Sequence, residues 1–333
     1  MDQGGSMAQK SKLRLSATLR VDQAEVDAQT GNRGPTPSAR PNTSVDPVLC
    51  VRFTRDGSYL LSATKEQRLI HLWNHRTGTY ISSFRGHGRQ VRDVDVERSN
   101  GAFVSCGGDH DVFKWDVERG RIVSKYRGHE RDVNAVRYDE KNCHVFVSGG
   151  NDQTIRVWDA RSKNSCIQVL GREHFKDSVM SVDWADAHSL VGGCVDGRVK
   201  EFDVRQGRVV VDDLGDPVTS VDATERYILA ACMGSNIKLL DRADGRLLQS
   251  FSGHRHEHTK LTAVLTTDEQ RVLSCSEDGY LCVWETLGGD GSLYKVQAHR
   301  GEVTCVAVCQ VGESVASCGL DGLVLVFSLH ATA

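Results

Sequence analysis

The sequence predicts an all-β protein in which seven similar units form a closed, seven-bladed β-propeller. The first observation is a recurring mark, in which a strand-like run ends in an aromatic or apolar residue that is usually followed by an acidic one. The marks are Trp73, Trp115, Trp158, Phe202, Leu240, Trp284 and Phe327. They are separated by 42, 43, 44, 38, 44 and 43 residues, close to the roughly 40–45 residues of a propeller blade.

The second observation is a Gly-His pair, or a weaker form of it, that precedes most of these marks. The forms are Gly86-His87, Gly128-His129, His174, Gly215-Asp216, Gly253-His254 and Ala298-His299. Where a clear histidine is present, 28 to 30 residues separate it from the mark, which leaves room for about three short strands. Asp-Gly pairs such as Asp56-Gly57 and Asp196-Gly197 supply the positive φ angles of tight hairpins.

Composition places the chain among ordinary globular proteins. Its 333 residues are 39% hydrophobic and carry a formal charge of -3, without the basic excess of a dedicated nucleic-acid binder. No apolar run is long enough for a membrane span, and no signal peptide is evident. The eleven cysteines contain no CxxC pair. We therefore expect reduced thiols. The charge balance gives no indication of direct nucleic-acid contact, and the lack of a membrane span or signal peptide predicts a cytoplasmic and nuclear location.

Between about Val48 and Ser328, the Gly-His start and the Trp-Asp end at this period resemble the WD40-repeat family. The resemblance implies a seven-bladed WD40 β-propeller whose ring is closed by a strand from one terminus. Residues 13–20 alternate as a strand should, so we expect them to complete the last blade. We expect residues 1–12 to form a disordered tail, residues 21–44 a flexible insert, and residues 45–330 the propeller.

Four units repeat the residue types of a serine hydrolase, with an aromatic residue added. The sets are His87, Ser105, Asp109 and Trp115; His129, Ser148, Asp152 and Trp158; His254, Ser274, Asp278 and Trp284; and His299, Ser317, Asp321 and Phe327. Four copies argue against a catalytic triad. The resemblance implies structural tetrads, in which His bridges Asp and Ser while Ser accepts from the Trp indole. Units one, four and five lack this set, so we expect weaker blades there.

Other candidate sites are weaker. His254, His256 and His258 alternate as metal ligands could, but no cysteine pair lies near them in sequence. Cys305 and Cys309 have a spacing that ordinary burial explains. Motifs for nucleotide binding and zinc proteases do not occur. We therefore expect no metal site, no cofactor and no catalytic residue.

Five arginines lie beside the histidine marks, in segments that join consecutive units. They are Arg89, Arg131, Arg172, Arg255 and Arg300. Loops of this kind gather on one face of a propeller, where a ring of guanidinium groups would suit acidic or phosphorylated protein partners. The alternative is an ordinary solvated surface.

Several stretches resemble one subfamily, the mitogen-activated protein kinase organizer. They are CVDGRV at 194–199, DLGDPVT at 213–219 and SCSEDG at 274–279. The resemblance implies a non-enzymatic, monomeric scaffold that collects kinase-cascade components, or a subunit of a nuclear splicing complex that binds splicing factors. A hydrolase using one His/Ser/Asp set is a distant third. We expect neither a small-molecule substrate nor a membrane partner.

Overall fold

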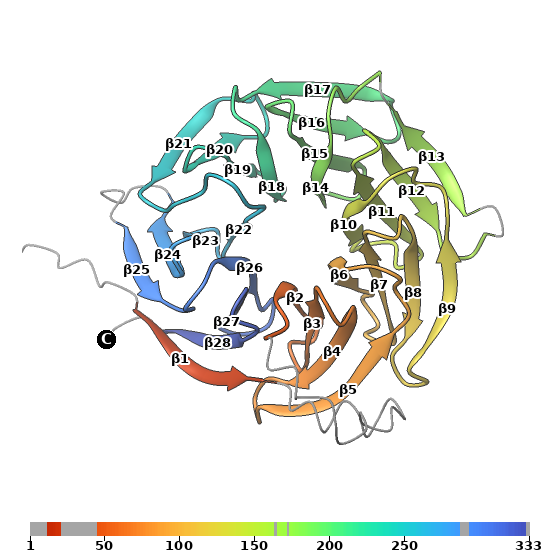
Figure 1. The fold of residues 1–333 in the computed structure, drawn as a ribbon. Coiled ribbons are helices and arrows are strands. Elements are labelled where there is room, and N and C mark those ends of the chain that lie inside the picture. Colours follow the sequence, from red (N-terminus) through yellow and green to blue (C-terminus); the bar gives the residue numbers. More distant parts are fainter. Residues whose placement is uncertain (1–11, 21–44, 163–164, 172, 287–292, 331–333) are drawn as a thin grey trace, which may run out of the picture.

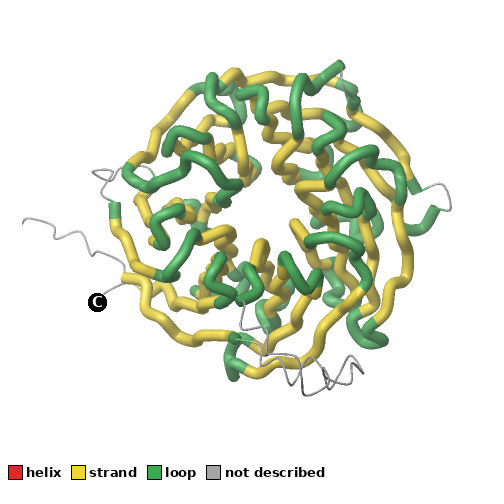
Figure 2. The backbone as a smooth tube through the Cα atoms, viewed as in Figure 1, coloured by secondary structure: helices red, strands yellow, loops and turns green. Residues whose placement is uncertain are grey.

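The computed structural model describes residues 12–20, 45–162, 165–171, 173–286 and 293–330. Its seven four-stranded antiparallel sheets stand as blades around a central channel (Figure 1). The described residues form strands and connecting loops, with no helix among them (Figure 2). The predicted all-β, seven-bladed propeller is therefore confirmed.

Each blade runs from an inner strand at the channel to an outer strand at the rim. Blade 1 contains β2 (Val48–Phe53), β3 (Leu60–Thr64), β4 (Leu69–Asn74) and β5 (Thr79–Arg85); blade 2 contains β6 (Val91–Val96), β7 (Ala102–Gly107), β8 (Val112–Asp116) and β9 (Arg121–Tyr126). Blade 3 contains β10 (Val133–Tyr138), β11 (Val145–Gly150), β12 (Ile155–Asp159) and β13 (Cys166–Leu170); blade 4 contains β14 (Val179–Trp184), β15 (Ser189–Cys194), β16 (Arg198–Asp203) and β17 (Arg208–Asp213).

The remaining blades follow the same order, except that the last takes its outer strand from the start of the chain. Blade 5 contains β18 (Val218–Ala223), β19 (Tyr227–Cys232), β20 (Asn236–Asp241) and β21 (Leu247–Ser252); blade 6 contains β22 (Ala263–Leu265), β23 (Arg271–Cys275), β24 (Tyr280–Glu285) and β25 (Tyr294–Gln297). Blade 7 contains β26 (Val303–Val308), β27 (Ser314–Gly319), β28 (Val324–His330) and β1 (Lys12–Leu19).

The ring closes where β1 pairs antiparallel with β28 (Figure 1). Leu15 lies opposite Phe327 and Leu19 opposite Val324, with a register shift between Leu15 and Ala17. The closing strand was predicted at residues 13–20 and is observed one residue earlier, so Lys12 belongs to β1. The rest of the predicted tail and the predicted insert at 21–44 lie outside the described residues.

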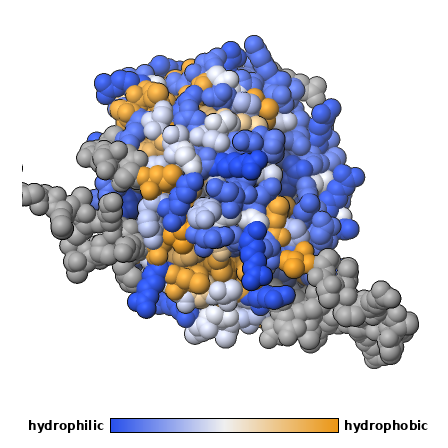
Figure 3. All heavy atoms as spheres, turned by 60° about the vertical axis from the view of Figure 1, so that its left-hand side comes forward, coloured by the Kyte–Doolittle hydropathy of each residue, from blue (hydrophilic) through white to orange (hydrophobic). Residues whose placement is uncertain are grey.

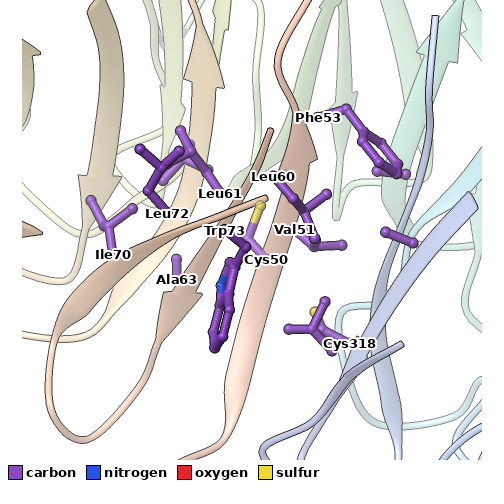
Figure 4. Close-up of a cluster of buried hydrophobic side chains, with 14 of the residues drawn as sticks. Cys50, Val51, Phe53, Leu60, Leu61, Ala63, Ile70, Leu72, Trp73 and Cys318 are labelled. Atoms are coloured by element: carbon purple, nitrogen blue, oxygen red, sulfur yellow. The ribbon is translucent and has the colours of Figure 1, made fainter. Parts of the chain in front are cut away.

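The core lies between the blades, because each blade packs one face against each neighbour. The second strands β7, β15 and β19 are buried at every residue, whereas the outer strands alternate between exposed and covered positions. Apolar residues therefore appear on the side of the ring as separate patches among hydrophilic ones (Figure 3). A large core cluster joins blades 1 and 2 to blade 7; Figure 4 shows Trp73, Cys50 and Cys318 within it.

Neighbouring blades are also joined by hydrogen bonds around the channel. A polar side chain on one inner strand accepts a backbone N–H from the next inner strand. The pairs are Asp93 with Val136 (3.2 Å), Asp95 with Tyr138 (2.7 Å), Asp183 with Ala223 (2.9 Å), Asp222 with Leu265 (2.7 Å) and Thr262 with Val306 (2.8 Å). These side chains fix the inner strands relative to one another without continuous sheet pairing.

Candidate functional site

Three of the four predicted His/Ser/Asp sets form continuous hydrogen-bond chains. In blade 3, His129 contacts Asp152 through Nδ1 (2.9 Å) and Ser148 through Nε2 (2.7 Å), and Trp158 Nε1 donates to Ser148 Oγ (2.8 Å). Blade 2 repeats this chain with His87, Asp109, Ser105 and Trp115, and blade 7 repeats its His-Asp-Ser part with His299, Asp321 and Ser317, beside Phe327. Each chain ties an inter-blade loop to the blade that follows it.

Burial and hydrogen bonding set the protonation states of the blade 3 tetrad. Burial favours a neutral Asp152, but the hydrogen bond from His129 and the N–H of Glu130 outweigh it and hold the pKa of Asp152 at about 2. Burial lowers the pKa of His129. The neutral His129 can then donate from Nδ1 to the carboxylate and accept at Nε2 from the Ser148 hydroxyl.

The serine hydroxyls of these chains are closed to substrates. Ser105, Ser148 and Ser317 each have 0% exposure, whereas a catalytic nucleophile must reach its substrate. These three sets in the described blades therefore have a structural role. None of them contains the solvent-accessible serine that the hydrolase hypothesis requires.

The predicted set in blade 6 is wrong. Neither ring nitrogen of His254 has a hydrogen-bond partner among the described residues, Ser274 Oγ donates to the carbonyl of Cys275, and Trp284 Nε1 donates to the carbonyl of Ser252. Asp278 instead lies 3.8 Å from Lys295. His254 stands 30 residues before Trp284, against 28 or 29 in the formed sets, so its ring is out of register with the serine and the aspartate.

A different residue occupies the place of the aspartate in blade 6. In the formed tetrads the aspartate also accepts the backbone N–H that follows the histidine, as Asp109 does from Gly88 (2.8 Å). In blade 6 Ser276 Oγ accepts the N–H of Arg255 (2.8 Å). A neutral hydroxyl therefore accepts this N–H in place of the tetrad aspartate, and Glu277 Oε1 accepts the N–H groups of Glu257, His258 and Thr259 further along the loop (2.6–3.0 Å).

Blades 1 and 4 contain hydrogen bonds and ion pairs that the sequence analysis missed. In blade 1 Trp73 Nε1 donates to Ser62 Oγ (2.9 Å), eleven residues earlier in the chain, whereas the spacing in the tetrads is ten. In blade 4 Asp196 forms a buried ion pair with Lys200 (3.1 Å). The one-residue offset of Ser62 concealed the first from a search for the common pattern. The second was concealed because the partner of Asp196 is a lysine on β16 and not a loop histidine.

Four of the five predicted partner-binding arginines, Arg89, Arg131, Arg255 and Arg300, lie in loops that leave the blades on one face. Each such loop joins an outer strand to the next inner strand, and because the four strands of a blade alternate in direction, these loops emerge together. We call this surface, formed by loops 86–90, 127–132, 214–217, 253–262 and 298–302, the tetrad face. The other ends of the strands form the opposite face.

The arginines on the tetrad face differ in their charge partners. Arg89, Arg131 and Arg300 are exposed, and in the described chain no carboxylate pairs with them. Arg255 is also exposed but lies 3.4 Å from Glu257 and 3.8 Å from Glu277. Arg172 lies outside the described residues. The structure therefore places on this face three guanidinium groups that form no ion pair with any described residue.

A cavity of about 530 Å³ occupies the central channel, with residues of all seven inner strands in its wall. Among the described residues, some charged side chains in the wall of this cavity form ion pairs, and others do not. Arg55 pairs with Asp95 (3.2 Å), and Arg137 with Asp93 (2.5 Å). On the wall formed by blades 4 and 5, Asp183 and Asp222 accept backbone N–H groups, and no ion pair to either is found in the described part of the chain.

The pKa values of the two carboxyls on this wall, Asp183 and Asp222, are raised. Burial raises the pKa of Asp222 to about 6, and burial together with the charge of Asp222 raises the pKa of Asp183 well above its usual range. The sequence carries a usable signal for these groups, since Val182-Asp183 and Val221-Asp222 each place an acid inside an apolar inner strand.

We expect Asp222→Asn to make the protein more stable than wild type above pH 6. A raised pKa means that the folded state holds its proton more tightly, so this stabilisation is complete below about pH 4 and is lost as pH rises through about 6. Asparagine keeps an acceptor for the Leu265 N–H. The gain should be about 1–2 kcal/mol at pH 7.5, measured by urea unfolding across pH, and should vanish below pH 4. The control is Glu225→Gln, which removes an exposed carboxylate and should leave the pH dependence of the unfolding free energy as in wild type. The prediction is contradicted if Asp222→Asn also leaves that pH dependence as in wild type.

Comparison with known proteins gives the family. A model described as the nucleolar protein 10-like N-terminal domain matches residues 65–284, and the WD domain, G-beta repeat model matches residues 40–74 and 291–328. WD repeat domain-containing protein 83 of Rattus norvegicus is 37% identical over 248 residues, covering 74% of this chain and 78% of that protein.

Two further relatives agree. The Xenopus tropicalis protein of the same name is 38% identical over 73% of this chain and 76% of its own, and an uncharacterized WD repeat-containing protein of Schizosaccharomyces pombe is 36% identical over 72% and 80%. Among the described residues, no helix has the length and apolar character to cross a membrane. The repeats, the closed ring and these matches show that the chain belongs to the WD-repeat family of β-propeller proteins.

Proposed function

We propose that the protein is a protein-interaction scaffold that binds acidic or phosphorylated segments of its partners on the tetrad face. The observation that carries the proposal is a set of three exposed arginines on loops from separate blades, Arg89, Arg131 and Arg300, for which the described part of the chain supplies no ion pair. Guanidinium groups form paired hydrogen bonds with carboxylates and phosphates. The tetrad aspartates accept backbone N–H groups of these loops, at Gly88, Glu130 and Arg300. They therefore fix the loop backbone that carries the arginines, which reduces the ordering cost of binding.

The partners we propose are components of a mitogen-activated protein kinase cascade, collected in the cytoplasm so that their effective concentration rises. The stretches at 194–199, 213–219 and 274–279 support this assignment through their resemblance to the kinase organizer. The same resemblance supports a second candidate, a structural subunit of a nuclear splicing complex. Both candidates use one non-enzymatic propeller, and they differ in compartment and partners.

We expect the double substitution of Arg131 and Arg300 to glutamate to weaken partner binding by about 10-fold or more, because it replaces two attractive charges with repulsive ones. Retention of partners in co-purification from cell extract measures the effect. The control replaces Arg121 and Arg208, exposed arginines at the start of the outer strands β9 and β17, with glutamate. The tetrad-face proposal fails if both double variants retain the partners equally well.

Purification of the tagged protein from nuclease-treated nuclear and cytosolic fractions separates the two candidates. Kinases and adaptors in the cytosolic fraction would support the signalling scaffold, and splicing proteins in the nuclear fraction would support the splicing subunit. Recovery of neither group would contradict both assignments and leave the WD-repeat propeller itself unaffected.

A further inference from the structure

A turn on the opposite face brings a thiol and an imidazole together. Cys143 and His144 follow β10, and the turn is closed by hydrogen bonds from Val145 N to the Asn142 carbonyl (3.0 Å) and from Ala160 N to the His144 carbonyl (2.7 Å). Consecutive residues of an extended strand point to opposite sides. In this turn, however, Cys143 Sγ and His144 Nε2 lie 3.9 Å apart.

The neighbouring blade supplies a carboxylate at the same place. Glu97 begins the turn after β6, where its backbone N–H donates to the Ala102 carbonyl (3.0 Å). Its side chain is 12% exposed, and Oε2 lies 3.5 Å from Lys114 Nζ. One ligand atom each from Glu97, Cys143 and His144 lies within 4.8 Å of the other two.

A buried hydroxyl without a hydrogen-bond partner belongs to Tyr138, at the end of β10 in the blade that carries Cys143 and His144. Tyr138 is 2% exposed, and its Oη has no hydrogen-bond partner among the described residues. The charges of Glu97 and Cys143 both act on this hydroxyl electrostatically. A buried hydroxyl without a partner is costly, so a polar group brought to this position would stabilise it.

We propose that Glu97, Cys143 and His144 bind Zn²⁺, with a water in the fourth position hydrogen-bonded to Tyr138. Thiolate, imidazole and carboxylate are the donors that zinc uses, and three protein ligands with one water give an open tetrahedral site. Calcium and magnesium prefer sites made of oxygen atoms. Binding releases the Cys143 proton to solvent, because the thiolate is the ligand. The proposal departs from the expectation of no metal site, which considered other residues.

Zinc binding requires the three ligand atoms to move slightly closer together. Zinc–sulfur and zinc–nitrogen bonds of about 2.3 and 2.0–2.1 Å put tetrahedral ligands roughly 3.4–3.8 Å apart. The Cys143–His144 separation of 3.9 Å is already close to this range, and the outer limit of 4.8 Å requires a closure of about 1 Å. Lys114 competes for Glu97, so zinc has to displace this ion pair.

Calorimetric titration of the chelator-treated full-length protein with Zn²⁺ tests the site, and Co²⁺ provides an absorption signature of a metal–thiolate bond. We expect one equivalent of metal to bind with thiolate charge-transfer absorption. Cys143→Ser should abolish that absorption, and Cys143→Ser and His144→Asn should each weaken zinc binding by more than the roughly 10–100-fold that follows loss of an outer hydrogen-bond partner. Lys114→Gln should tighten binding by freeing Glu97.

Cys166→Ser is the matched control, because Cys166 is another partly exposed thiol, on β13 of blade 3. It should bind metal as wild type does. Unchanged circular dichroism in every variant establishes that the fold is retained. The zinc site is refuted if wild type binds no metal, or if Cys143→Ser keeps the cobalt–thiolate absorption while Cys166→Ser loses it.

Discussion

Leu19→Ala should destabilise the protein by about 2–5 kcal/mol, the range for removing a buried leucine side chain. Leu19 has 0% exposure and lies at the end of β1, opposite Val324 of β28. It belongs to the core cluster that joins blade 7 to blades 1 and 2. The substitution therefore leaves a cavity where the ring closes. Urea unfolding followed by tryptophan fluorescence measures the loss.

The same strand supplies the control. Leu15 is 52% exposed, so Leu15→Ala should change stability by less than about 0.5 kcal/mol. The two variants make the same chemical change four residues apart. Equal effects would mean that β1 is not held against the core as the structure shows.

Asp152→Ala should lower stability by about 1–3 kcal/mol, because it strands buried donors of the blade 3 tetrad. The carboxylate, 2% exposed, contacts His129 Nδ1, Glu130 N and Thr154 Oγ1 at 2.8–3.0 Å. Its lowered pKa means that its stabilisation is present above about pH 4 and is lost as pH falls toward 2. Melting curves should therefore differ most between wild type and variant near neutral pH.

Asp278 occupies the matching sequence position in blade 6 and provides the comparison. Its side chain is 34% exposed and contacts Lys295 at 3.8 Å, and His254 is not bonded to it. Asp278→Ala should therefore change stability by less than about 0.5 kcal/mol. A loss as large as that of Asp152→Ala would show that blade 6 contains a working tetrad after all.

The fold was predictable because its information is local and repeated. The period of about 43 residues set the number of blades, and alternation at residues 13–20 indicated the closing strand. Three of the four tetrads were found because the same residue types recur at corresponding places in the repeat. His254 was misassigned because a residue type at roughly the right distance does not fix the register of a loop. One or two extra residues between His254 and Trp284 displace its ring relative to the formed sets.

The sequence did not predict which residues meet in the channel or in the proposed zinc site, because both sites form between blades. Asp183 and Asp222 belong to different repeats, 39 residues apart, and affect each other only after the inner strands pack. Glu97 and Cys143 are separated by 46 residues and belong to different repeats, so the period alone does not bring them together. Contacts between blades depend on packing angles that a repeat period does not specify.

If the tetrad face binds partners as we propose, its uneven charge restricts how an anionic partner segment can be oriented. Arg89, Arg131 and Arg300 lie on the junctions between blades 1 and 2, 2 and 3, and 6 and 7. Across the ring, Asp216 at the junction of blades 4 and 5 pairs with Lys238 (3.6 Å), and Arg255 at the junction of blades 5 and 6 pairs with Glu257 and Glu277. A ring of identical blades would accept a ligand in seven equivalent rotational settings. In the proposed scaffold, an anionic segment is attracted to one sector, while ion pairs neutralise the sector facing it, so the partner has a preferred rotational orientation on the ring.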